Sequence, residues 1–326
     1  MKILNADTPQ RFFVTGGAGF IGSHLVDRLL ASGHQVVVYD NLSTGNLPFL
    51  ENATRSPNFS FLHGDLLDAG SLQTAMQGCD FVFHLAANAD VRFGTLHPKK
   101  DLEQNTLATF NVLESMKVCG IRHIAFTSTG SIYGEPDVFP TPEHAPLPIQ
   151  TSFYGASKLA GESLIEAFCE GFDFQAWIFR LVSLVGERYS HGHIFDFYKQ
   201  LRAHPEELRV LGDGTQRKSY LYVHDCLDAM FLAIEKAKGR VNIFNLGSDE
   251  YCSVNDSIRW ITEELGLQPQ RVYSGGPRGW VGDNTFIFLD CSRCRELGWR
   301  PTLSIREGIL NTLRYLRLNP WLLEMR

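Results

Sequence analysis

A glycine-rich stretch near the start of the chain, residues 15–22, constrains the fold more than any other segment. Residues 11–14 before it read as a short buried strand, and Ile21, Leu25 and Leu29 recur at helical spacing. A strand that turns through glycines into a helix directs backbone N–H groups and the positive helix end to one point, which suits a pyrophosphate. The sequence therefore predicts a dinucleotide-binding turn.

A carboxylate after the second expected strand adds context, because glycine triplets alone also occur in ordinary tight turns. Residues 35–39 form an apolar strand, and Asp40 follows at its end. A carboxylate at this position binds the ribose 2′-OH of NAD and repels the 2′-phosphate of NADP. The alternative interpretation of Asp40 is a helix or turn cap before Asn41. We expect NAD as the cofactor, with the polar segment 41–45 around its adenosine.

The composition is that of an ordinary globular protein and argues against two classes of partner. The 326 residues carry a formal net charge of −6, and the few basic residues are scattered, which argues against a nucleic-acid surface. No apolar run approaches the roughly 20 residues needed to cross a bilayer, and residues 1–7 contain no apolar signal region. We expect a cytoplasmic protein without nucleic-acid or membrane partners.

The cysteines point to a reducing environment. There are seven, an odd number, which indicates free thiols and not a disulfide framework. Cys291 and Cys294 have the spacing of half a metal site, but no second ligand pair accompanies them. The sequence predicts no metal site.

Apolar strand-like segments alternate with helical segments through the first 180 residues. Beyond the two strands above, we expect strands at 59–63, 81–85, 124–126 and 175–179. The long crossovers between them imply a parallel sheet covered by helices on both faces. The predicted fold is α/β, a Rossmann-type doubly wound sheet over residues 1–180. A smaller C-terminal α/β lobe is expected over 181–326, with segments such as 241–245 returning to the large sheet.

Several local signals complete the expected secondary structure. One helix is expected from about residue 101 to 117, and the proline-containing loop 135–150 should be extended and irregular. Asp65, at the end of the third strand, is placed to meet adenine, with a plain helix cap as the alternative. Ser253 and Ser304 read as helix starts of the capping-box type.

Tyr154 and Lys158 are the residues that point most directly to chemistry. They are four residues apart, so on a helix they share one face. An ammonium beside a phenol favours the phenolate, and we expect the pKa of Tyr154 to fall from roughly 10 toward neutrality. Such a phenol can take a proton from a sugar hydroxyl while a nicotinamide takes the hydride.

With this pair, the chain resembles the extended short-chain dehydrogenases/reductases, specifically the nucleotide-sugar epimerase and dehydratase branch. The matching motifs cover nearly the whole chain and lie at residues 16–22, 40–45, 84–87, 127–134, 154–158, 212–217, 222–225 and 282–283. They are specific for the branch and less specific for the substrate.

The resemblance implies roles for individual residues. The catalytic residues would be Thr129, Tyr154 and Lys158, with the Thr129 hydroxyl bonding the reacting sugar oxygen; a strand-end threonine bonding only backbone is the alternative. The residues implied to contact NAD are Gly16, Gly19, Phe20, Ile21, Gly22, Asp40, Asn41, Ser43, Thr44, Gly45, Asp65, Leu66, Leu85, Ala86, Ala87, Asn105, Tyr154 and Lys158. Those implied to contact the substrate are Arg92, Thr129, Ser183, Arg217, Arg278, Asp283 and Ile287.

The second lobe, 181–326, would hold the nucleotide sugar. Arg217 matches an arginine that grips the diphosphate, a task that suits bidentate geometry, while Arg278 and Asp283 match a phosphate-and-ribose pair. A solvated side chain is the alternative for both arginines. Ser183 departs from the family, which commonly has asparagine there, so that contact is lost or bridged by water. Ile287 falls where a tyrosine excludes N-acetyl groups, so we expect tolerance of N-acetylhexosamines.

The activity implied is epimerisation of a nucleoside-diphosphate sugar, most often a UDP-sugar at C4, through a transient 4-keto intermediate with tightly held NAD. A homodimer packed through two helices per subunit is implied as well. A 4,6-dehydratase, a uronate epimerase or decarboxylase, and a non-catalytic NAD-binding regulator remain alternatives. Retention of the three catalytic residues argues against the regulator. Elimination needs a further acid and base, and the resemblance implies acidic residues for this just after the catalytic threonine, where this chain has Gly130 and Ser131; this favours the epimerase.

Overall fold

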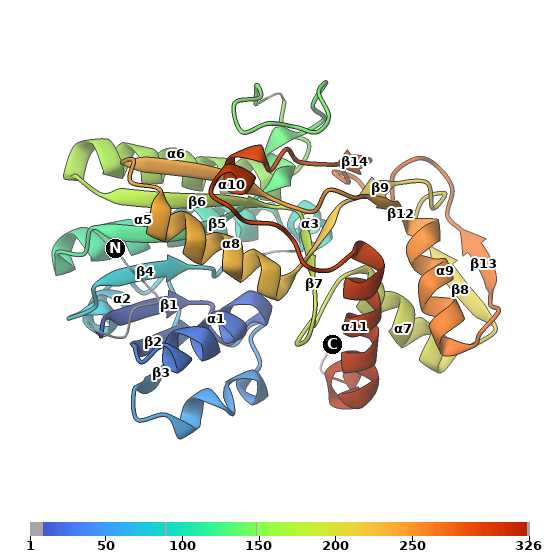
Figure 1. Ribbon diagram of the computed structural model, residues 1–326, viewed down its shortest axis with the longest axis horizontal. Coiled ribbons are helices and arrows are strands. Elements are labelled where there is room, and N and C mark those ends of the chain that lie inside the picture. Colours follow the sequence, from blue (N-terminus) through green and yellow to red (C-terminus); the bar gives the residue numbers. More distant parts are fainter. Residues whose placement is uncertain (1–8, 89, 148, 325–326) are drawn as a thin grey trace.

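In the computed structural model, which describes residues 9–88, 90–147 and 149–324, a seven-stranded sheet forms the larger part of the molecule (Figure 1). Its strands in spatial order are β11 (Val241–Leu246), β6 (Gln175–Leu181), β5 (His123–Thr129), β4 (Phe81–His84), β1 (Arg11–Thr15), β2 (Gln35–Asp40) and β3 (Phe59–His63). Every neighbouring pair is parallel. The predicted Rossmann-type sheet is confirmed, and so is the return of segment 241–245.

Helices cover both faces of this sheet, as predicted, because its strands alternate their apolar side chains between two cores. Phe12 faces one core and Phe13 the other. The first face is covered by α1 (Phe20–Ala31), α8 (Val223–Lys236) and the short α10 (Ser292–Glu296), and α1 and α8 lie side by side (Figure 1). The second is covered by α2 (Ala69–Met76), α5 (Ala108–Cys119) and α6 (Phe153–Phe172).

A smaller lobe with its own apolar core lies to the right in Figure 1. Its helices are α7 (His193–Ala203), α9 (Val254–Leu265) and α11 (Ile305–Leu318). Three small sheets join it: β7 (Ser183–Val185) with β10 (Tyr220–Tyr222), β8 (Glu207–Val210) with β13 (Gln270–Tyr273), and β12 (Cys252–Ser253), β9 (Arg217–Lys218) and β14 (Phe286–Ile287). The expected capping boxes at Ser253 and Ser304 are both present.

The helical segment before α5 differs from the prediction of one regular helix over 101–117. It follows α3 (Val91–Leu96) and begins earlier with α4 (Pro98–Asp101), because proline is well suited to the first helical position. It then widens into a π-helical stretch, η3 (Leu102–Leu107), and becomes α-helical only in α5. π-helical turns of this kind are common at functional sites.

The remaining segments are short helical turns and loops. The 3₁₀ turns are η1 (Leu47–Leu50), η2 (Ala53–Arg55), η4 (Gly130–Tyr133) and η5 (Pro320–Glu324). The loop 135–150 is irregular as expected, although Pro148 lies outside the described residues. Among the described helices, none combines the length and the apolar character needed to span a bilayer.

Candidate functional site

The turn between β1 and α1 has an open helix end at its centre. Gly16 has a φ of +70° and donates its N–H to the carbonyl of Tyr39 at 3.1 Å. No side chain caps α1, which begins at Phe20, so the amides of its first turn have no acceptor within the helix. A Cβ on Gly22 would lie 2.2 Å from the carbonyl oxygen of Gly16. This close packing leaves a backbone cradle suited to an anion.

Asp40 lies beside this cradle at the end of β2. Its Oδ2 accepts the N–H of Ala18 at 3.0 Å, and its Oδ1 accepts the N–H of Leu42 at 2.8 Å. The carboxyl is largely buried, and burial raises its pKa while the two backbone N–H groups oppose that rise. Gly45 leaves it room, since a Cβ there would lie 2.9 Å from Oδ1. Asp40 therefore caps its own turn and also presents a carboxylate next to the glycine turn.

Asp65 is tied to the segment after β2. The Asn41 side-chain amide donates to Asp65 Oδ2 at 3.0 Å, and the Asn41 Oδ1 accepts the N–H of Ser43 at 3.0 Å. Asp65 Oδ1 accepts the N–H of Leu67, whereas Asp68 caps α2. The helix-cap interpretation of Asp65 is therefore wrong. Segment 41–45, which includes Thr44, returns to the glycine turn, because the next residue, Asn46, donates its N–H to the carbonyl of Ala18 at 2.9 Å.

The residues after β4 cross the glycine turn. The N–H groups of Leu85 and Ala86 both donate to Thr15 Oγ1 at 3.2 Å, and a Cβ on Gly16 would lie 2.7 Å from the Ala86 nitrogen. The small side chain of Ala86, with Ala87 next in line, lets the chain pass close to Gly16. The structure thus brings most of the expected cofactor residues to one edge of the sheet, where the strand order reverses between β1 and β4. Leu66, in contrast, is buried in the second core.

Asn105 is buried in the π-helical stretch and joins three segments. Its Oδ1 accepts the N–H of Asn88 at 2.8 Å, and its side-chain amide donates to the carbonyl of Asn88 at 3.2 Å and to Ser157 Oγ at 2.9 Å. Ser157 in turn donates to the carbonyl of Tyr154 at 2.9 Å. The side chain therefore fixes the segment after β4 to the start of α6.

Thr129 and Tyr154 meet at the carboxyl end of β5. Thr129 is the last residue of β5, and its hydroxyl shares a hydrogen bond with the Tyr154 side chain. Thr129 Oγ1 also accepts the N–H of Ser131 at 3.1 Å, so it bonds backbone as well. A Cβ on Gly155 would lie 2.9 Å from the carbonyl oxygen of Ser131, which shows how closely α6 approaches the turn η4. This approach places the phenol beside the threonine.

Burial dominates the ionisation of Tyr154 and Lys158. It raises the pKa of Tyr154 to about 12, with the Thr129 hydrogen bond opposing and Asp101 adding to the rise. The Lys158 ammonium is buried 3.9 Å from the centre of the Phe126 ring, and burial lowers its pKa to about 7. The expectation that the pKa of Tyr154 falls toward neutrality is wrong for this structure, because desolvation outweighs the Thr129 hydrogen bond that opposes it.

Ile287 lies against the residue that follows Thr129. A Cβ on Gly130 would lie 3.2 Å from Ile287 Cγ2 and 3.4 Å from Leu289 Cδ1. Ile287 belongs to β14, which pairs with β9 so that Ile287 lies opposite Lys218. The structure therefore brings Ile287 against the residue next to Thr129 in the chain, although the two segments are far apart in the sequence.

The side chains of the neighbouring residues Arg217 and Lys218 lie in different surroundings. The Arg217 guanidinium lies 4.0 Å from the centre of the Phe286 ring and its side chain is exposed. The Lys218 ammonium is largely buried and pairs with Asp283 Oδ1 at 2.7 Å, while Asp283 Oδ2 accepts the N–H of Gly279 at 3.0 Å. Lys218 was not among the sequence candidates, because only its burial beside Asp283 distinguishes it from a surface lysine.

The other substrate candidates lie around the turn that carries Asp283. Arg278 pairs with Glu135 of the proline-containing loop. The Arg92 guanidinium lies 5.7 Å from the Trp280 ring centre, and Trp280 O accepts the N–H of Asp283 at 3.1 Å. The turn 278–283 therefore gathers both arginines, whereas Ser183 is exposed at the start of β7.

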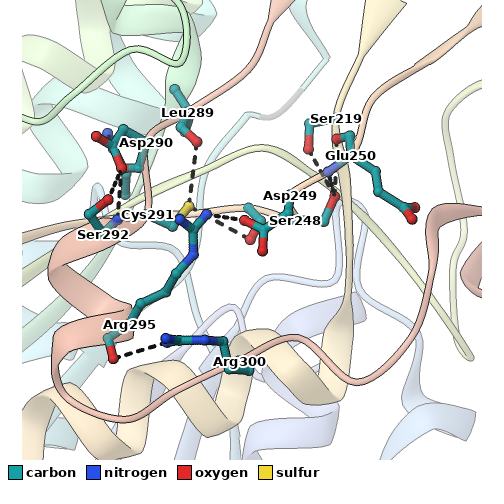
Figure 2. Close-up of polar contacts among 12 residues, drawn as sticks. Ser219, Ser248, Asp249, Glu250, Leu289, Asp290, Cys291, Ser292, Arg295 and Arg300 are labelled. Atoms are coloured by element: carbon teal, nitrogen blue, oxygen red, sulfur yellow. Dashed lines mark hydrogen bonds and ion pairs between the residues drawn. The ribbon is translucent and has the colours of Figure 1, made fainter.

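The Cys291–Cys294 pair is part of the apolar core and not of this site. Figure 2 shows the Cys291 thiol directed at the carbonyl of Leu289, at 3.7 Å, with Asp290 accepting the N–H of Ser292 at the start of α10. Arg295 on the same helix pairs with Asp249 (Figure 2). All seven cysteines are free. Within residues 9–88, 90–147 and 149–324, no group of three or more His, Cys, Asp or Glu side chains could hold a metal ion.

Comparisons with known proteins agree with this arrangement. The profile of the NAD dependent epimerase/dehydratase family matches residues 12–247. A UDP-glucose 4-epimerase of Mycolicibacterium smegmatis is 34% identical over 94% of this chain and 99% of its own length. A crystal structure of a UDP-galactose 4-epimerase superimposes with a TM-score of 0.85 and 38% identity, covering 95% of this chain and all of that one. The crystal structure of the dTDP-glucose 4,6-dehydratase DesIV from Streptomyces venezuelae, with NAD bound, superimposes with a TM-score of 0.87 and 27% identity. It covers 95% of this chain and 98% of that one.

Proposed function

Because the chain belongs to the NAD-dependent epimerase/dehydratase family, we propose that it is a nucleotide-sugar 4-epimerase. Relatives in this family carry out epimerisation, dehydration and decarboxylation, so membership alone does not select the reaction. The observation that carries the proposal is the pair Gly130 and Ile287 next to Thr129. The most similar relatives described above, which are 4-epimerases, support the same choice.

The residues around the β1–α1 turn fit NAD. The uncapped start of α1 suits the pyrophosphate, and the Asp40 carboxylate beside it suits ribose hydroxyls and disfavours a 2′-phosphate. Asn41 and Asp65, joined by a hydrogen bond, would lie on the adenosine side. NAD bound there would supply reversible hydride transfer to and from the sugar carbon.

The chain itself contributes a group that transfers a proton and a hydroxyl that orients the sugar. Tyr154 Oη is the group that takes the proton from the sugar hydroxyl and returns it. Thr129, which already shares a hydrogen bond with the phenol, orients the same sugar oxygen. Lys158, buried on Phe126 one helical turn away, supplies a positive charge that favours the phenolate during proton transfer.

The smaller lobe would bind the rest of the nucleotide sugar. Arg217, exposed above Phe286, is proposed to contact the diphosphate. The turn 278–283 is proposed to contribute Arg278 and Asp283, with Arg92 beside it. Under this proposal residues 1–180 bind NAD and 181–326 bind the substrate, with α8 and β11 returning to the large sheet.

Elimination is disfavoured by the side chains that follow Thr129. A dehydratase needs a base for the C5 proton and an acid for the leaving hydroxyl, each within about 3 Å of its target. Gly130 has no side chain, and Ile287 and Leu289 fill the space where one would extend. The hydroxyl of Ser131 is neither acidic nor basic enough near neutral pH. Epimerisation needs neither group.

Product analysis tests the proposed reaction. With UDP-glucose or UDP-galactose as substrate, we expect a product of unchanged mass whose NMR spectrum shows inversion at C4. UDP-glucuronate is incubated in parallel as the probe for the decarboxylase alternative. A product lighter by one water identifies a dehydratase, and one lighter by carbon dioxide identifies a decarboxylase; either result contradicts the proposal.

Ile287 is expected to set the tolerance for N-acetyl sugars. Because isoleucine is smaller than tyrosine and lies against Gly130, the enzyme should also epimerise UDP-N-acetylhexosamines. Ile287→Tyr should lower kcat/KM for the N-acetyl sugar roughly tenfold or more relative to the plain hexose, the usual size of a steric exclusion. Val281→Tyr, at an exposed position on the same segment, is the control. Equal losses for both sugars in Ile287→Tyr would contradict this role.

We further propose a cytoplasmic homodimer that binds no nucleic acid. The free state of all seven cysteines supports a reducing compartment. Exposed apolar side chains on η3 and α5, namely Leu102, Leu107 and Phe110, support a helical interface between two copies. The net charge of −6 supports the absence of a nucleic-acid surface.

A further inference from the structure

A buried ion pair joins the catalytic helix to the sheet. Glu162 of α6 and Arg180 of β6 have side chains only 2% and 5% exposed. Arg180 Nη2 donates to Glu162 Oε2 at 2.8 Å, and Arg180 Nε donates to both carboxylate oxygens at 3.2 Å. Buried ion pairs often add no more stability than apolar side chains of the same volume. Stability alone therefore does not account for this pair.

The arginine end of the pair holds the turn that follows Thr129. Arg180 Nη1 donates to Tyr133 Oη at 2.7 Å and to the carbonyl of Glu143 at 2.9 Å. The Tyr133 hydroxyl donates to Asn245 Oδ1 at 2.8 Å. Tyr133 is the last residue of η4, which starts directly after Thr129. One guanidinium thus links α6, the Thr129 turn and the proline-containing loop.

The glutamate end of the pair lies one helical turn beyond Lys158. Residues four apart on a helix are surface neighbours about 5–6 Å apart at Cβ. The Lys158 ammonium otherwise lies over the Phe126 ring on β5, and its charge lowers the pKa of the buried His84 on β4. Burial lowers the pKa of Lys158, and Glu162 is the charge that opposes this.

The remaining ionisable groups near this cluster do not replace that charge. Tyr154 precedes Lys158 on α6 and stays neutral, because burial raises its pKa to about 12. His84 is neutral as well, since burial and Lys158 lower its pKa to about 3. Asp101 raises the pKa of Tyr154, whereas Glu166 is itself affected by Glu162, which raises its pKa, and by Arg180, which lowers it. Glu162, four residues along the same helix, is thus the anion that opposes the lowering of the Lys158 pKa.

We infer that Glu162 is a positioning residue that favours the ammonium form of Lys158, and that Arg180 fixes this carboxylate while holding the turn of Thr129. This inference rests on the proposed roles of Lys158 and Thr129. The ion pair therefore couples the charge on the catalytic helix to the placement of the catalytic hydroxyl. Both would be lost together if the pair were broken.

The ionisation of Lys158 can be measured without any substrate. Protein labelled with ¹³C at lysine Cε is followed by NMR as the pH is varied, in the presence of excess NAD. The Lys158 signal is identified by its absence in Lys158→Met. Glu162→Gln should lower the pKa of Lys158 by about one pH unit or more, the usual effect of losing an adjacent opposite charge. Glu166→Gln, the same change one turn further along α6, should leave it almost unchanged. The alkaline limb of kcat should move with the Lys158 titration.

A double variant separates this role from a structural one. Glu162→Gln alone leaves the Arg180 charge buried without its partner and can destabilise the protein. Glu162→Gln/Arg180→Gln removes both charges, so the fold should recover while the pKa of Lys158 stays low. The inference would be overturned if the pKa of Lys158 in the double variant equalled that in the wild type. It would also be overturned if Glu166→Gln lowered this pKa as much as Glu162→Gln does. Because the titration needs no reaction, an unexpected product would reject only the proposed function.

Discussion

Tyr154→Phe is expected to lower kcat by about 10²–10⁴-fold, the usual contribution of a general acid–base group, while the Kd of the nucleotide sugar changes by no more than a few fold. The hydroxyl acts on the proton in transit, whereas the ring only packs, so the loss should appear in kcat and not in binding. The side chain lies where the role requires, hydrogen-bonded to Thr129 at the carboxyl end of β5.

Initial rates and calorimetry with the unreacted nucleotide sugar measure the two quantities separately. Tyr198 on α7 is a partly buried tyrosine, so Tyr198→Phe is the matched control for loss of a phenol hydroxyl elsewhere in the protein. This variant should keep the wild-type kcat. A Tyr154→Phe enzyme that retains more than a tenth of the wild-type kcat would assign the base to another residue.

Gly22→Ala is expected to abolish retention of NAD by the purified protein. The added Cβ would lie 2.2 Å from the carbonyl oxygen of Gly16 and 2.7 Å from the Cα of Gly17, so α1 and the glycine turn must separate. Overpacking of this kind typically destabilises by about 1–3 kcal/mol. Here it also opens the backbone cradle that suits the pyrophosphate.

A matched glycine in another helix isolates the steric effect. Gly171 is near the end of α6, and a Cβ there would meet nothing within 4 Å. Gly171→Ala should keep its NAD and gain slightly in stability, since alanine is favoured over glycine in helices by roughly 1 kcal/mol. The nucleotide released on denaturation is quantified for both variants. Wild-type NAD content in Gly22→Ala would show that the cradle does not hold the pyrophosphate.

The sequence by itself determined the features that neighbouring residues control. The glycine turn, the alternation of strands and helices and the capping boxes at Ser253 and Ser304 are each specified within a few positions of the chain. Tyr154 and Lys158 are found in the same way, because helical spacing alone places them on one face. Asp40 follows from its position at the end of a strand, and its bonds to Ala18 and Leu42 show that it caps its own turn, as the alternative interpretation predicts.

Tertiary structure decided everything that depends on residues far apart in the chain. The pKa of Tyr154 rises instead of falling, because desolvation depends on what packs around the phenol and not on sequence spacing. The pairing of Lys218 with Asp283 and the contact of Ile287 with Gly130 join segments separated by 65 residues or more. The π-helical stretch at Asn105 likewise depends on what that side chain contacts beyond its own helix. Local sequence patterns determine the helices and strands. Burial and long-range pairing determine the ionisation of the side chains, because the dielectric around a group is set by the whole fold.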